Sequence, residues 1–376
     1  MARLPQGVIK RKNGTLQKRF TLDGKRYSIY GHTVPELLEK ELLKRQEIER
    51  GLYKKNKQVI LDDYFEEFIE QRSKFVKGNT IYKYKTLYKN HLKPLLGSRK
   101  VVSIERRECL KTQNTLCKKL TISTNNEVMK ILKTILGNAV IDGIISENPM
   151  IAVKMLKDTN KVSATETKHR ALTEIEQRAF MQQLKEDNAY YYELIAFMLS
   201  TGMRYGECVA LSWADIDTKN NVIHVNKTIT KDVNGKQAIG TPKTKTSIRD
   251  IPMNDTIREV LRSQKKKCAI IYSTIPHGID NRVFPSPYGN IPFVRQFNED
   301  LKGAIKRVNE QGIKLEPFSS HCFRDTFATR FIEQGGTPQT LKTILGHSSL
   351  SMTMDLYAHV LPNTKAEEMN RITIVV

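Results

Sequence analysis

The sequence predicts a multidomain protein that is mainly α-helical and carries small β-sheets. Three observations lead to this prediction. Short alternating segments separated by turn pairs fill the first 50 residues, amphipathic helical segments follow, and the remainder mixes helical and strand patterns. With 376 residues, the chain is long enough for two or three domains that each bury a core.

The chain is strongly basic, which bears on its partner. It has 62 Lys and Arg residues against 40 Asp and Glu residues, so its formal net charge is +22 at pH 7. A charge of this sign and size favours a polyanionic partner, and nucleic acid is the first candidate. No apolar run approaches the roughly 18 residues of a membrane-spanning helix, and no secretory signal opens the chain. We therefore expect a soluble, cytoplasmic protein without a membrane partner.

The cysteine pattern bears on redox state and metal binding. Five cysteines are scattered along the chain: Cys109, Cys117, Cys208, Cys268 and Cys322. Their number is odd and no two form a CxxC pair, which indicates neither a disulfide framework nor a zinc site. We expect reduced thiols, no metal and no other cofactor.

Residues 1–52 have the pattern of a small basic module. The pairs Asn13-Gly14 and Asp23-Gly24 favour hairpin turns, and they separate three alternating segments around Val8 to Lys10, Gln17 to Leu22 and Arg26 to Tyr30. A helix is expected from Thr33 to about Arg50. The predicted three-stranded sheet carries basic residues that could meet DNA phosphates in a groove: Lys10, Arg11, Lys12, Lys18, Arg19, Lys25 and Arg26. The alternative is a basic hairpin whose charges are only solvated.

Residues 57–155 predict a compact helical domain. In the helix expected from Gly78 to Leu92, Tyr82, Tyr84 and Tyr88 alternate with lysines, as on a surface that follows a DNA backbone. We expect Pro94 and Gly97 to end this helix. The other helices are expected around Tyr64 to Ile69, from Arg106 to Leu120 and from Asn125 to Asp142. Such a domain could clamp a duplex, and the alternative is a charged helical surface that is only solvated.

The polar stretch 156–169 is the predicted linker, and residues 170–376 are the predicted last domain. An apolar helix from about Tyr190 to Ser200 must be central to its core. Strands are expected around Val222 to Val225 and around Ile248 to Met253, with a hairpin turn at Asn234-Gly235 between them. The last domain therefore mixes α and β elements.

Arg204 lies between that apolar helix and a second apolar helix, which we expect to run to Trp213. A guanidinium at this junction is costly to desolvate unless an acid or an anion meets it. Either Glu207 or Asp215 pairs with it structurally, or a phosphate does.

The stretch from Ser320 to His359 concentrates further polar groups. Phe323, Phe327 and Phe331 recur at every fourth residue, which predicts a helix buried along that stripe. His321 and Arg324 lie three residues apart and off the stripe, so they are presented together.

A second imidazole and a phenol follow in the same stretch. A short helix begins at Thr337-Pro338 and is closed by Gly346, directly before His347. Tyr357 lies beside another apolar stripe, with its hydroxyl free to point elsewhere. Each of these residues alone is more often structural, but two His, one Arg and one Tyr in under forty residues together indicate phosphate chemistry.

With these motifs in order, the last domain resembles the catalytic domain of the tyrosine recombinases, the phage and transposon integrases. The resemblance is carried by TGMRYGE, HCFRDTFAT, LGHSS, MDLYAH and the lysine hairpin PKTKTSIRDIP. The matched positions are Arg204, His321, Arg324, His347, the nucleophile Tyr357 and the general acid Lys243, with Lys245 as the fallback. The two preceding domains resemble the arm-binding domain and the helical, SAM-like core-binding domain of conjugative-transposon integrases.

The resemblance implies a site-specific recombinase that integrates and excises a mobile element through a 3′-phosphotyrosine intermediate, with no cofactor. It also implies double-stranded DNA with arm and core sites as substrate, a homotetramer in the synaptic complex, and a bacterial protein located on the nucleoid. An excisionase or a DNA-bending factor is an optional partner. We expect the apolar end Ile372 to Val376 to dock on a neighbouring protomer, the alternative being an edge strand of its own sheet. Two rival functions are a catalytically silent DNA-binding protein and a type IB topoisomerase.

Overall fold

The computed structural model describes Pro5 and residues 7–11, 14–22, 25–49, 58–157, 170–274 and 281–351. Contacts divide the chain into two units, Met1–Asp158 and Thr159–Val376, and each is described by itself. Tyr357 and the end of the chain lie outside the described residues, as does most of the expected linker.

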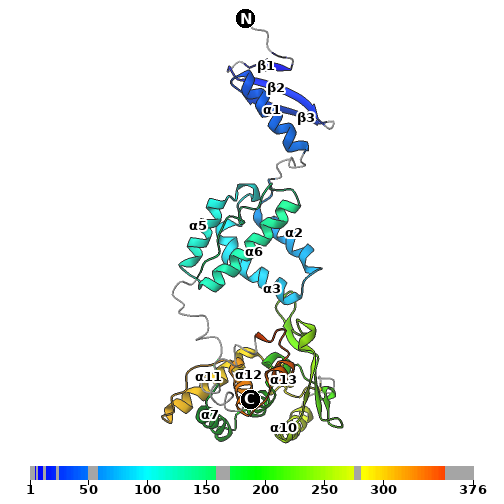
Figure 1. The fold of residues 1–376 in the computed structure, drawn as a ribbon, viewed down its shortest axis with the longest axis vertical. Coiled ribbons are helices and arrows are strands. Elements are labelled where there is room, and N and C mark those ends of the chain that lie inside the picture. The colour runs from blue at the N-terminus through cyan, green and yellow to red at the C-terminus, as the bar shows by residue number, and fades with distance from the viewer. Residues whose placement is uncertain are drawn as a thin grey trace, which may run out of the picture. The chain divides into compact units, whose positions relative to one another are not determined.

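The first unit begins with a three-stranded antiparallel sheet in the order β1-β2-β3, covered by helix α1 (Figure 1). The bounds are β1 Val8–Lys10, β2 Leu16–Leu22, β3 Lys25–Gly31 and α1 Val34–Glu49. A small core of Phe20, Ile29 and Leu37 holds the helix on the sheet. This confirms the predicted sheet and helix. Lys18 pairs with Glu41 of α1, so its ammonium is already engaged within the module.

The first unit continues with a helical bundle. Its helices are α2 Leu61–Ser73, α3 Gly78–Leu87, α4 Lys93–Leu96, α5 Arg106–Cys117 and α6 Ile122–Ile141. Of the two residues expected to end the second helix, Pro94 does not end it, whereas Gly97 does, as the C-cap of α4. A π-helical turn at Tyr88–Leu92 leads instead into α4, with Pro94 in its first turn, a position at which proline is tolerated.

Tyr84 of α3 and Tyr88 of the π turn belong to the core of this bundle. Tyr88 stacks on Phe65 with 3.6 Å between ring centroids, and its hydroxyl donates to Asp62 Oδ1 at 2.7 Å. Tyr84 stacks on Phe68. The expected surface of alternating basic and aromatic groups is therefore wrong for Tyr84 and Tyr88, because the aromatic face packs inward while Lys83 and Lys89 stay exposed.

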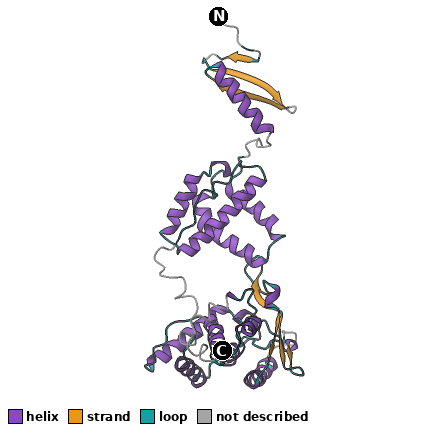
Figure 2. Ribbon diagram, in the orientation of Figure 1, coloured by secondary structure: helices purple, strands orange, loops and turns teal. Residues whose placement is uncertain are grey.

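The second unit is mainly helical and carries short strands, as Figure 2 shows. Its helices are α7 Glu174–Glu186, α8 Tyr192–Thr201, α9 Tyr205–Cys208, α10 Asp255–Ser273, α11 Val294–Glu310, α12 His321–Glu333 and α13 Pro338–Leu345. Its strands are β4 Ile216–Asp217, β5 Val222–Val225, β6 Thr228–Lys231, β7 Gln237–Gly240 and β8 Arg249–Pro252. The core includes Phe197 of α8, Phe297 of α11 and Phe323 of α12, each fully buried.

The strands form two sheets. One has the antiparallel order β4-β5-β8, and β6 pairs with β7 in a separate hairpin. The turn at Asn234-Gly235 therefore joins β6 to β7, and the strand that returns to β5 is β8. The residues between β7 and β8, which include the lysine motif, lie outside this three-stranded sheet and connect the β6-β7 hairpin to β8.

Two further findings concern the described part of the chain as a whole. Within it, no helix combines the length and apolarity needed to cross a membrane. The described residues also contain no group of three or more His, Cys, Asp and Glu side chains arranged to hold a metal ion.

Candidate active site

The turn that carries Arg204 is fixed by a glycine. Gly202 ends α8 in the left-handed conformation, with φ +63°. A Cβ atom there would come within 2.4 Å of Phe327 Cδ1 and 2.7 Å of Leu345 Cδ2. Only glycine therefore allows α12 and α13 to pack this closely on the turn, two residues before Arg204.

Glu207 holds Arg204. Its carboxylate accepts from the backbone N of Arg204 at 3.0 Å and from Arg204 Nη1 at 2.9 Å. Glu207 is buried, whereas the Arg204 side chain is about one-third exposed, so the guanidinium is anchored from beneath and reaches the surface. Asp215, the other candidate partner, instead accepts from Ser212 and from Lys227 Nζ at 2.7 Å.

The helix that follows Arg204 is shorter than expected. It has a single turn, and the chain then enters an extended segment in which Ser212 bridges Arg282 and Val283 N donates to Leu211 O. The predicted apolar helix up to Trp213 is wrong, because Leu211 and Ser212 adopt an extended conformation and pair with Arg282 and Val283.

Arg324 lies off the phenylalanine stripe of α12, as expected, but it is 3 % exposed rather than presented to solvent. Its Nη1 donates to Gly202 O at 2.7 Å and its Nη2 to Leu345 O at 2.6 Å. Burial, and then the neighbouring charge of Arg204, lower the pKa of Arg324 to about 9, so the group is still charged at pH 7. A buried guanidinium that donates hydrogen bonds to neutral carbonyls, and that lies near a second guanidinium, attracts an anion.

His347 follows α13 as predicted. Thr337 caps this helix by accepting from Thr340 N, and Gly346 ends it with φ +67°. The backbone N of His347 donates to Lys342 O at 3.1 Å, and the side chain is buried. His321 is the first residue of α12, one turn ahead of Arg324, and is exposed.

The lysine loop, residues 241–247 between β7 and β8, touches the same region. Lys243 and Lys245 are both exposed. The carbonyl of Thr246 would lie 2.8 Å from a Cβ on Gly346, so the loop packs directly against the residue before His347.

The structure thus brings together segments that are far apart in sequence. Arg324 bonds to the segments of Arg204 and His347, and the lysine loop touches the latter. Tyr357 lies outside the described residues, so its place relative to these groups is not part of this arrangement.

The sequence reasoning missed one buried residue in this cluster, Arg249. Its guanidinium donates to both oxygens of Glu207 and to Ser247 O. The signal was present in the alternation of β8, because Arg249 shares its inward face with Ile251, where an apolar residue is the rule.

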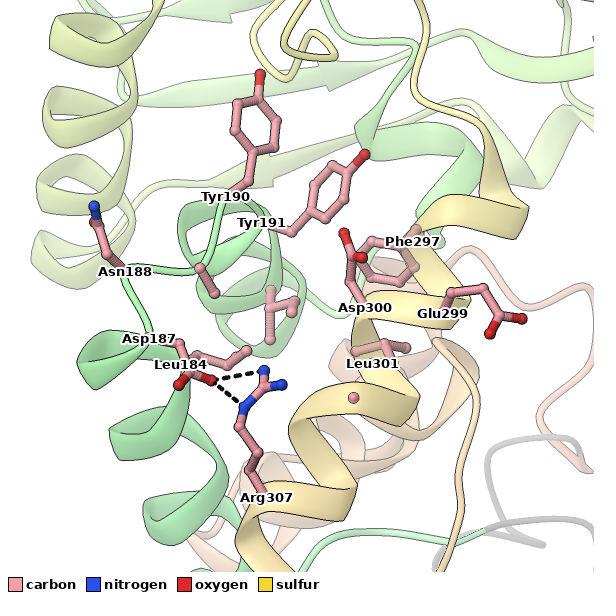
Figure 3. Close-up of a pocket in the computed structure, with 13 residues that line it drawn as sticks. Leu184, Asp187, Asn188, Tyr190, Tyr191, Phe297, Glu299, Asp300, Leu301 and Arg307 are labelled. Carbon is pink, nitrogen blue, oxygen red and sulfur yellow. Dashed lines mark hydrogen bonds and ion pairs between the residues drawn. The ribbon is translucent and has the colours of Figure 1, made fainter.

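A separate cavity of about 310 Å³ lies between α11 and the segment joining α7 to α8 (Figure 3). It is lined by aromatic residues such as Tyr191 and Phe297, and its Asp187 is paired with Arg307 at 2.7 Å. Of the candidate catalytic residues that the structure describes, Arg204, Lys243, His321, Arg324 and His347, none lines it. Burial raises the pKa of Tyr191 to about 12, which makes this phenol a poor nucleophile at neutral pH.

Family models match two stretches of the chain. A model described as "Phage integrase family" matches residues 170–364, and one described as "Phage integrase, N-terminal SAM-like domain" matches residues 60–117. The first match covers more than half of the chain.

Similar proteins come from bacteria and mobile elements. The chain is 28% identical over 392 aligned residues to a "Tyrosine recombinase XerC-like" protein of Caldanaerobacter subterraneus subsp. tengcongensis, covering 96% of this chain and 97% of that one. It is 27% identical to the ICEBs1 integrase of Bacillus subtilis, over 90% of each chain. It is also 27% identical to the transposase from transposon Tn916 of Enterococcus faecalis, over 89% of this chain and 83% of that one.

Solved structures share the fold. The Tn1549 transposon integrase in complex with a circular intermediate DNA superposes with a TM-score of 0.69 at 25% identity, covering 84% of this chain and 99% of that one. A lambda integrase tetramer bound to a Holliday junction has a TM-score of 0.58 at 17% identity, covering 95% of this chain and 96% of that one.

Proposed function

The chain belongs to the phage integrase family, and from this premise we propose how its residues cut and rejoin DNA. It is a tyrosine recombinase of the conjugative-transposon kind, which binds DNA sites and recombines them. The observation that best supports the roles proposed below is Arg324, whose guanidinium joins the Arg204 turn to the segment before His347.

Strand cleavage is a transesterification. We propose that the hydroxyl of Tyr357 passes its proton to solvent water as it attacks the scissile phosphorus, forming a phenolic P–O bond while the bond to the 5′ oxygen breaks. The DNA stays attached through a 3′-phosphotyrosine, so the bond energy is kept for religation. Reversal of the same step by a 5′-hydroxyl from the partner strand completes the exchange.

The cationic groups stabilise the charge that develops on the phosphate. Arg204 and Arg324 offer forked donors to the non-bridging oxygens, and His321 and His347 add further donors. Glu207 orients Arg204 and takes no part in proton transfer. The two guanidiniums supply the positive charge that a metal ion would otherwise provide.

The departing 5′ oxygen needs a proton. Lys243 of the lysine loop is proposed as the general acid, with Lys245 as the alternative, because an exposed loop ammonium can move to meet the leaving group. Neither lysine has a fixed place in the core, which suits a group that acts only when DNA is bound.

The other parts of the chain are proposed to bind and synapse the DNA. Residues 1–52 would bind arm sites, and residues 57–155 would bind core sites. Residues 156–169 would link these domains to the catalytic domain, residues 170–376. The positive net charge of the chain favours contacts with DNA phosphates. Recombination of two duplexes breaks four strands and each protomer supplies one Tyr357, so a homotetramer is proposed. The end of the chain would dock on a neighbouring protomer, an excisionase or DNA-bending factor could assist, and the chromosomal substrate places the enzyme on the bacterial nucleoid.

A trapped covalent adduct tests the chemistry. A duplex with the end of the mobile element, nicked a few nucleotides beyond the scissile phosphate, loses the short fragment that carries the 5′-hydroxyl and cannot religate. We expect a protein–DNA adduct on a denaturing gel that Tyr357→Phe abolishes while gel-shift binding persists. Tyr288→Phe is the matched control, since Tyr288 is 78% exposed in the same unit and should leave the adduct unchanged. An adduct that survives Tyr357→Phe would refute the proposed nucleophile.

A further inference from the structure

Arg249 is a charged residue on the buried face of β8, where a strand normally carries an apolar side chain. It opens the strand, pairs with Val225 of β5, and its side chain is only 4 % exposed. A guanidinium is kept in such a place only when fixed acceptors replace its water.

Those acceptors come from three different segments. Nη2 donates to Glu207 Oε2 at 2.9 Å, and Nη1 donates to Glu207 Oε1 at 3.3 Å and to Ser247 O at 3.0 Å. Nε donates to the carbonyl of Ile344 in the last turn of α13. One side chain therefore ties the Arg204 turn, the lysine loop and the helix that ends before His347.

The carboxylate of Glu207 is shared between two arginines. Each of its oxygens accepts once from Arg204 and once from Arg249. Burial by itself raises the pKa of Glu207, but the hydrogen bonds and charge of Arg249, joined by those of Arg204, outweigh it and keep the pKa below its ordinary value. Arg249 thus keeps the anchor of Arg204 ionised and in place.

We infer that Arg249 is a positioning residue for strand cleavage, which acts without touching DNA by fixing Glu207 under Arg204 and the lysine loop against the segment of His347. The inference rests on the proposed function, because it assigns Arg249 a part in the geometry of that site. A purely structural role is the competing explanation. If the role is only structural, a variant that regains stability should also regain its cleavage rate. If Arg249 positions the site, such a variant should still cleave slowly, because the contacts of Arg249 are missing.

The test uses the full chain with three variants: Arg249→Met, Arg249→Lys and the double variant Glu207→Gln/Arg249→Met. The double variant leaves neither buried charge unpaired, so it should unfold at a higher temperature than Arg249→Met. It still cannot hold Arg204 or the lysine loop. The cleavage rate is measured on the nicked duplex at saturating protein, at a temperature where the fluorescence of Trp213 shows each variant folded.

We expect Arg249→Met and the double variant to cleave about 100-fold more slowly than the parent, because misplacement of catalytic groups costs about this much. Binding in a gel shift should stay within about threefold, since a buried side chain does not contact DNA. Arg249→Lys guards against a variant that fails to fold. Its single ammonium cannot reach all three segments, so a loss of at least about tenfold is expected.

A matched control is Arg282→Met, which removes another buried arginine and should cleave at the parent rate. If the double variant cleaves within about tenfold of the parent, the positioning role is overturned. Failure of the proposed function is a different result, because then the parent itself would form no adduct that depends on Tyr357.

Discussion

Glu207→Gln tests the ion-pair network under the candidate site through protein stability. The substitution keeps the shape of the side chain and removes its charge. The carboxylate accepts four hydrogen bonds from Arg204 and Arg249, whereas the amide offers one oxygen and turns two donors toward other donors.

The magnitude follows from burial. Glu207 and Arg249 are 3 % and 4 % exposed as side chains, so the variant leaves Arg249 charged and buried without its partner. Removing one member of a buried pair costs about 3–5 kcal/mol. Arg204 is about one-third exposed, so water screens its share and we add nothing for it. In a unit of this size the melting temperature should fall by roughly 6–20 °C.

The assay is thermal unfolding followed by tryptophan fluorescence. The chain has a single tryptophan, Trp213, in the second unit, so the signal reports on this unit alone. Glu299→Gln is the matched control, because Glu299 is exposed and its pair with Lys302 should contribute less than about 1 kcal/mol.

The pH dependence has a definite sign. The folded pKa of Glu207 lies below its ordinary value of 4.5, so the stability that the charge contributes is complete above that pH and is lost as the pH falls through the folded pKa. The gap in melting temperature between parent and variant should therefore narrow on acidification. A gap of less than about 2 °C at neutral pH, or one that widens in acid, would refute this reasoning.

Three further predictions concern the turn, the general acid and the reaction class. Gly202→Ala should destabilise the second unit by more than about 1 kcal/mol because of its positive φ and the contacts with Phe327 and Leu345, whereas Gly312→Ala, with positive φ but open space, should cost less by the same fluorescence assay. Lys243 and Lys245 are each replaced by Ala, and the variant that lacks the general acid should cleave about 100-fold more slowly. A substrate with sulfur in place of the 5′ oxygen should restore the rate of that variant, because a thiolate leaves without a proton. If neither loss is restored, the acid lies elsewhere. The enzyme should not relax a supercoiled plasmid that lacks attachment sites, and efficient relaxation would favour a topoisomerase.

Local chemistry explains what the sequence predicted well. Hairpin pairs near Gly14 delimited the first sheet, and Thr337 and Gly346 marked both ends of α13, because caps and turns depend on a few neighbouring residues. The motif residues Arg204, Arg324 and His347 were found by type and order, and the fold brings their segments together.

The remaining features depend on contacts that a local pattern does not contain. Tyr84 and Tyr88 pack inward because Phe68 and Phe65 of α2 offer them stacking partners. Arg204 pairs with Glu207, whereas Asp215 pairs with Lys227, and the local sequence around Arg204 does not contain the second contact. Arg249 was missed because the meaning of a charge on the inner face of β8 depends on Glu207, forty-two residues earlier.

The most direct measurement identifies the amino acid that becomes joined to DNA. The trapped adduct is digested with nuclease and trypsin, and the peptide that carries a residual nucleotide is sequenced by mass spectrometry. The tryptic peptide 343–365 contains one tyrosine, Tyr357. We predict that the nucleotide is attached to this residue, and attachment to any other peptide would contradict the account of the active site.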